Sequence, residues 1–107
     1  AERLANDKVA NCEVIDLRSL IPLDKETIFE SVKKTSKVLI VHEDKVFSGF
    51  GAELAATIGT ELFQHLDAPI QRVGSVFTPV GFHPVLEKAI LPDADRIYKA
   101  ASDLLAY

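Results

Sequence analysis

Residues 37–41 read Lys-Val-Leu-Ile-Val, and this short stretch decides the fold. Its four consecutive apolar residues do not alternate with polar ones, which is the pattern of a parallel strand covered on both faces. We therefore expect a central strand over residues 37–41, with helices packed on each side of the sheet.

Helical periodicity flanks this strand in both directions. Asp24 is a candidate N-cap for a preceding helix, and the sequence Gly-Phe-Gly at 49–51 leads into a longer helix that follows a polar turn at 43–48. The apolar residues expected to face the sheet are spaced three and four apart: Ile28, Phe29 and Val32 in the first helix, and Leu54, Ala55, Ile58, Leu62 and Phe63 in the second.

The remaining elements continue the alternation of strands and helices. We expect the end of a helix over residues 1–8, a strand over 12–17 that buries Cys12, a strand over 69–74, a loop over 74–82, a helix over 84–90, and a closing helix over 92–107 that buries Ile97, Leu104 and Leu105. This order predicts one domain over residues 1–107, an α/β protein with three α/β/α layers and a mainly parallel sheet.

Composition excludes several classes of function. Hydrophobic residues make up 48% and charged residues 26% of the chain, which is ordinary for a protein with a packed core. The net charge of -4 and the scattered basic residues argue against a nucleic-acid partner. No uncharged stretch has the length of a membrane span. Residues 1–9 lack the apolar core of a secretory signal. A single cysteine suits a reducing compartment.

The most prominent polar cluster is His42-Glu43-Asp44, followed by the glycines at 49 and 51. It lies at the carboxyl end of a parallel strand, where α/β folds place ligand sites, so it could hold an anion or a partner. Alternatively, the glycines permit a tight turn, and Glu43 or Asp44 caps the next helix. A dinucleotide fingerprint would need a third glycine, which residues 52–56 do not contain.

Other chemistry finds weaker support. A metal site could draw on His42, Glu43, His65 and His83, but their spacing matches no known ligand pattern. Cys12 lies within an expected strand and no nucleophile elbow is present. The acidic pairs Glu43–Asp44 and Asp93–Asp95 are expected to be solvated or capping. The residues therefore nominate no catalytic, cofactor-binding or metal site.

Several motifs together resemble one family. Residues 14–24 read Val-Ile-Asp-Leu-Arg-Ser-Leu-Ile-Pro-Leu-Asp, a run similar to that of transketolase-type C-terminal domains. The motifs Val-His-Glu-Asp at 41–44, Ser-Gly-Phe-Gly-Ala-Glu-Leu at 48–54, Leu-Asp-Ala-Pro at 66–69 and Arg-Val-Gly at 72–74 resemble the beta subunit of thiamine-diphosphate-dependent 2-oxo acid dehydrogenases, of the pyruvate and branched-chain type. The C-terminal domain of transketolase or 1-deoxyxylulose-phosphate synthase and an independent anion- or nucleotide-binding module are alternatives.

The resemblance implies a non-catalytic domain for assembly and partner docking. Its implied partners are the alpha and beta subunits of the dehydrogenase and the subunit-binding domain of the acyltransferase core. Thiamine diphosphate and Mg belong to other domains of the parent enzyme, so the isolated domain is expected to be inactive. The resemblance also implies the cytoplasm of a bacterium or a mitochondrial matrix.

The chain departs from the family at two places. Residues 77–82 read Phe-Thr-Pro-Val-Gly-Phe where the family commonly has Asp-Thr-Pro-x-Pro-Phe. The first strand of the family domain, which lies between the strands expected at 12–17 and 37–41, is missing. We expect self-association as a result. The expected interface residues are His42, Glu43, Phe47, Phe50, Phe77, Phe82 and His83.

Overall fold

The computed structural model describes residues 2–7, 10–18, 23–46, 49–75 and 93–107. Its elements are α1 (Glu2–Asn6), α2 (Lys25–Thr35), β1 (Leu39–Lys45), α3 (Phe50–Leu62), the 3₁₀ turn η1 (Phe63–His65), β2 (Gln71–Ser75) and α5 (Ala94–Leu105). The expected helix at 84–90, and the loop at 74–82 beyond Ser75, lie outside the described residues.

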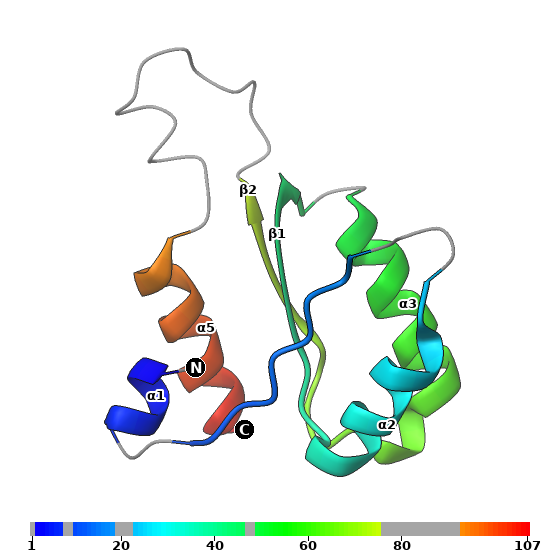
Figure 1. The fold of residues 1–107 in the computed structure, drawn as a ribbon, viewed down its shortest axis with the longest axis horizontal. Helices are drawn as coiled ribbons and strands as arrows, with labels where there is room; N and C mark the ends of the chain where they lie inside the picture. Colours follow the sequence, from blue (N-terminus) through cyan, green and yellow to red (C-terminus); the bar gives the residue numbers. More distant parts are fainter. Residues whose placement is uncertain (1, 8–9, 19–22, 47–48, 76–92) are drawn as a thin grey trace.

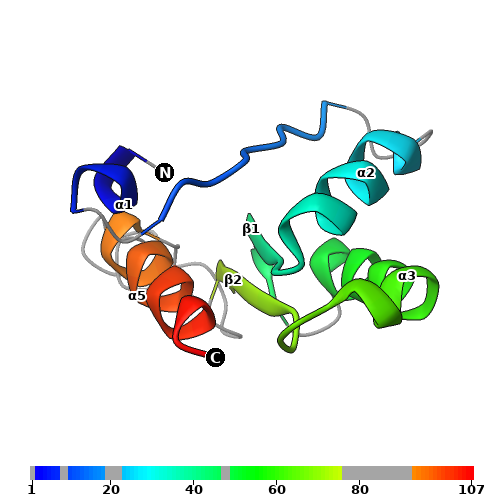
Figure 2. The same cartoon turned by 90° about the horizontal axis from the view of Figure 1, so that it is seen from below.

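The elements form three layers. Figures 1 and 2 show the two strands between α2 and α3 on one side and α1 and α5 on the other. The strands pair in parallel, with Leu39 opposite Gln71 and Val41 opposite Val73. The predicted α/β/α fold with a parallel sheet is therefore confirmed. No helix in the described part of the chain is long and apolar enough to cross a membrane.

Helix α2 begins where the sequence predicts. Asp24 caps it, because its carboxylate accepts hydrogen bonds from the Thr27 N–H at 3.2 Å and the Thr27 hydroxyl at 2.7 Å. Ile28 and Val32 lie on the buried face. The helix ends at Ser36, which adopts the left-handed conformation with φ of 64°.

Helix α3 supplies the centre of the core. Leu54, Ile58 and Leu62, spaced four residues apart, pack with Ile28, Val32 and Ile40 in one cluster. Phe63 was expected to join this cluster, and that prediction is wrong, because Phe63 is 76% exposed. It lies one residue, or about 100°, beyond Leu62 around the helix, and the α-helix ends before it.

The covering of β1 on both faces is only partly confirmed. Ile40 is buried against α2 and α3, but its neighbour Val41 is 43% exposed. β1 also runs further than expected, because Lys45 still pairs with Ser75 across an irregularity in the ladder. The Ser75 hydroxyl donates to the Glu43 carbonyl, and residues 43–45, which were expected in a turn, belong to the strand.

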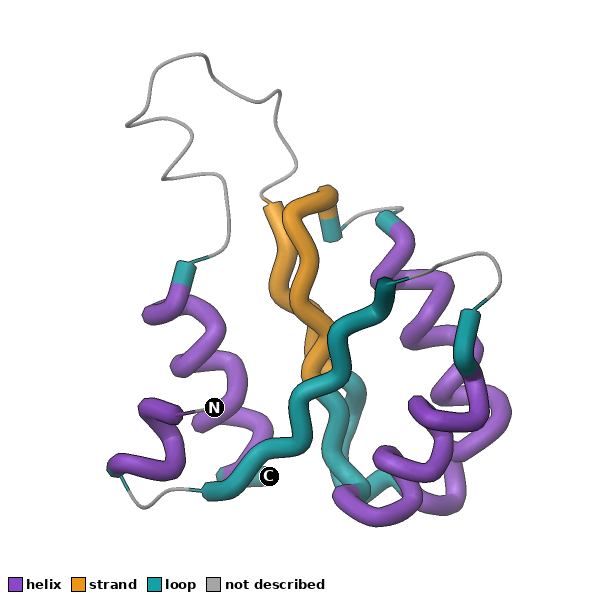
Figure 3. The backbone as a smooth tube through the Cα atoms, in the orientation of Figure 1, coloured by secondary structure: helices purple, strands orange, loops and turns teal. Residues whose placement is uncertain are grey.

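The strand expected at residues 12–17 is the largest error. Residues 10–18 run extended beside the sheet in the same general direction as β1, but they form no strand (Figure 3). Val14 is 76% exposed and Cys12 is exposed instead of buried. A β-favouring sequence becomes a strand only when a neighbour accepts its hydrogen bonds, and the described residues provide none here.

The exposure of Cys12 has a direct chemical consequence. We expect its thiol to react with a disulfide reagent in the native protein at a rate within about tenfold of that in denaturant, because access controls thiol reactivity. Stopped-flow thiol titration measures both rates. Native protection by a factor of about 100 or more would mean that residues 10–18 are buried as the sequence pattern suggested.

Helices α1 and α5 contact each other through side chains. Arg3 pairs with Asp95 at 2.7 Å, and its guanidinium lies 4.2 Å from the centre of the Tyr98 ring. The Tyr98 hydroxyl donates to Asp7 at 2.8 Å, and this hydrogen bond raises the pKa of Tyr98. Leu4 is buried in the same corner.

Helix α5 differs in part from its expected core face. Asp93 caps it by accepting from the Arg96 N–H at 2.8 Å, as expected for this acidic pair. Leu104 is buried and Ile97 half-buried, but Leu105 is 36% exposed because it follows Leu104 around the helix onto the outer side.

Candidate site: a groove along the open edge of the sheet

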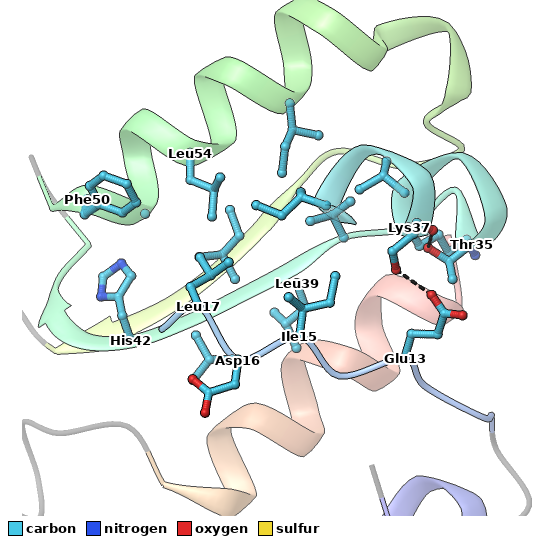
Figure 4. Close-up of a pocket in the computed structure, with 18 residues that line it drawn as sticks. Glu13, Ile15, Asp16, Leu17, Thr35, Lys37, Leu39, His42, Phe50 and Leu54 are labelled. Atoms are coloured by element: carbon cyan, nitrogen blue, oxygen red, sulfur yellow. Dashed lines mark hydrogen bonds between the residues drawn. The ribbon is translucent and has the colours of Figure 1, made fainter. Parts of the chain in front are cut away.

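A groove of about 480 Å³ lies between β1 and residues 13–17 (Figure 4). Its floor is apolar and comes from the two helices on that side of the sheet: Ile28 and Val32 of α2, and Leu54 and Ile58 of α3. One wall is residues 37–42, and the other is the extended stretch 13–17. The groove therefore has the shape of a slot bordered by two extended stretches of backbone.

The β1 wall presents backbone groups to this slot. The Gln71 N–H donates to the Val38 carbonyl at 3.1 Å, and the parallel register directs the N–H and C=O of Ile40 toward β2. Backbone groups of successive strand residues point to opposite sides, so those of Leu39 and Val41 face the groove. Within the described residues no strand pairs with this edge.

The opposite wall combines apolar side chains with an anchoring ion pair. Ile15 and Leu17 line the groove, and Ile15 remains 39% exposed. The Glu13 carboxylate accepts hydrogen bonds from Lys34 Nζ at 2.6 Å and from the Ser31 hydroxyl at 2.5 Å, which ties the stretch to α2. The hydrogen bonds from Lys34 and Ser31 lower the pKa of Glu13 below its ordinary value.

The Glu13 anchor should depend on pH. Because the pKa of Glu13 is lower in the folded than in the unfolded chain, the anchor is present at neutral pH and is lost as the pH falls through the folded pKa. Glu13→Gln should reproduce the acid state at neutral pH. We expect backbone order parameters of residues 12–17 to fall below about 0.6 by NMR relaxation.

Glu30→Gln is the matched control for this change, since Glu30 is exposed on the same helix as Lys34. It should leave residues 12–17 as ordered as in the parent chain. Equal order in the Glu13→Gln chain and the control would show that the Glu13 contacts do not hold the segment.

His42, Phe50 and Gly51 meet at one end of the groove (Figure 4). Gly51 allows a close approach: a Cβ there would lie 2.3 Å from Nε2 of His42 and 3.3 Å from Cγ2 of Ile40. The structure thus brings together two of the seven expected interface residues, His42 and Phe50, while Glu43 is exposed on the same strand. Phe47, Phe77, Phe82 and His83 lie outside the described residues.

The structural role expected for the two glycines needs correction. No described glycine has positive φ, and Gly49 adopts an extended conformation with φ of -79°. Gly51 is required by packing rather than by a turn. The N-cap residue of α3 is Gly49, which has no side chain to cap the helix. Glu43 and Asp44 belong to β1, and the cap expected from one of them remains a prediction.

Two of the candidate metal ligands named from the sequence, His42 and His65, lie far apart. His42 faces the start of α3, whereas His65 follows its end, about 20 Å away by the rise of a 13-residue helix. The described part of the chain contains no group of three or more potential metal ligands. The charged residues that line the groove are Glu13, Asp16 and Lys37, and Glu13 is paired with Lys34.

Sequence reasoning missed this groove as a site. Glu13, Ser31 and Lys34 carry no motif, because their contact spans 18 to 21 residues along the chain and depends on the tertiary fold. The only available signal was the apolar alternation of Ile15 and Leu17, which predicted a paired strand rather than one wall of an open slot.

Comparison with curated proteins gives matches over the whole chain. It is 44% identical over 107 residues to the pyruvate dehydrogenase E1 component subunit beta of Rickettsia felis, covering 100% of the chain and 32% of that protein. It is 43% identical over 108 residues to the mitochondrial 2-oxoisovalerate dehydrogenase subunit beta of Dictyostelium discoideum, covering 100% and 29%. It is 39% identical over 100 residues to the acetoin:2,6-dichlorophenolindophenol oxidoreductase subunit beta of Bacillus subtilis, covering 94% and 29%.

The chain therefore spans about a third of the length of these relatives. The family model described as the transketolase C-terminal domain matches residues 1–97. This match covers every described element except the end of α5, and the three-layer arrangement agrees with it. The chain belongs to the transketolase C-terminal domain family.

Proposed function

We propose that the chain is the C-terminal domain of a 2-oxo acid dehydrogenase beta subunit, and that it serves assembly and partner docking rather than catalysis. The similarity over the whole chain to beta subunits carries this proposal. Their names refer to pyruvate, 2-oxoisovalerate and acetoin, so comparable identity accompanies three different substrates. A segment shared in this way is poorly suited to select the substrate.

The proposed partners are the alpha and beta subunits of the parent enzyme and the subunit-binding domain of its acyltransferase core. We place the contact at the end of β1, where Glu43 is exposed beside His42 and Phe50. The net charge of -4 favours a basic partner surface. Phe47, Phe77, Phe82 and His83 complete the proposed interface.

Thiamine diphosphate and Mg would be bound by other parts of the parent enzyme. The apolar floor of the groove supports this assignment, because aliphatic side chains do not attract a diphosphate. The parent enzyme would then work in a bacterial cytoplasm or a mitochondrial matrix, as the compartment named for the Dictyostelium relative suggests.

Calorimetric titration tests the docking role. The chain should bind the purified alpha subunit or the subunit-binding domain, and Glu43→Lys should weaken that binding at least about tenfold. Glu26→Lys makes the same charge change on the exposed side of α2 and should leave the affinity unchanged. Absence of binding to both proteins, or equal weakening by the two substitutions, would overturn the proposal.

A separate titration distinguishes the alternative module. Thiamine diphosphate and common nucleotides should give no saturable heat with this chain. Saturable binding of either would favour an independent anion-binding domain instead.

A further inference from the structure

We draw no further inference here: the strongest candidate, the groove between β1 and residues 13–17, belongs to the site already described, and a strand seated in it restates an established property of the family's fold.

Discussion

Ile58→Ala should lower the free energy of unfolding by about 2–5 kcal/mol, the usual cost of a cavity at a fully buried aliphatic residue. Ile58 is 1% exposed and lies in the core formed by α2, α3 and β1. Its side chain also forms part of the groove floor. Urea unfolding followed by circular dichroism measures the change.

Phe63→Ala, in the 3₁₀ turn that follows α3, is the control. The sequence pattern places Phe63 and Ile58 on the same apolar face, but Phe63 is 76% exposed. Its substitution should cost less than about 0.5 kcal/mol although the side chain is larger. A larger loss for Phe63→Ala than for Ile58→Ala would mean that α3 is rotated relative to this structure.

Gly51→Ala should destabilise the chain by about 1–3 kcal/mol, because a methyl group there overlaps the His42 ring and approaches Ile40. Combining Gly51→Ala with His42→Ala should recover most of the loss, and a double-mutant cycle measures that recovery.

Gly59→Ala, in the same helix, should change the stability of the chain in the opposite direction. A Cβ at Gly59 meets no atom within 4 Å, so alanine should stabilise the helix by up to about 1 kcal/mol. Destabilisation by both substitutions would show that the cost at Gly51 is a general property of the helix rather than a contact with His42.

Local signals in the sequence predicted most helices and the parallel pair. Asp24 and Asp93 cap the helices that follow them, and the four-residue spacing of Leu54 and Ile58 identified the core face of α3. These features depend on residues within one or two turns of each other. The resemblance to transketolase-type C-terminal domains was confirmed by the family match.

Long-range pairing explains what the sequence could not predict. Residues 12–17 have strand-like composition, yet they lie across the groove from β1 and pair with no strand in the described part of the chain. The contact of Glu13 with Ser31 and Lys34 likewise depends on how the segment lies against α2.

Residue-resolved amide exchange of β1 tests the open edge most directly. The N–H of Ile40 points toward β2, whereas those of Leu39 and Val41 face the groove. We predict exchange at Leu39 and Val41 at least about 100-fold faster than at Ile40 in a dilute monomeric sample. Uniform protection along the three residues would contradict an open edge, and with it the groove on which the account depends.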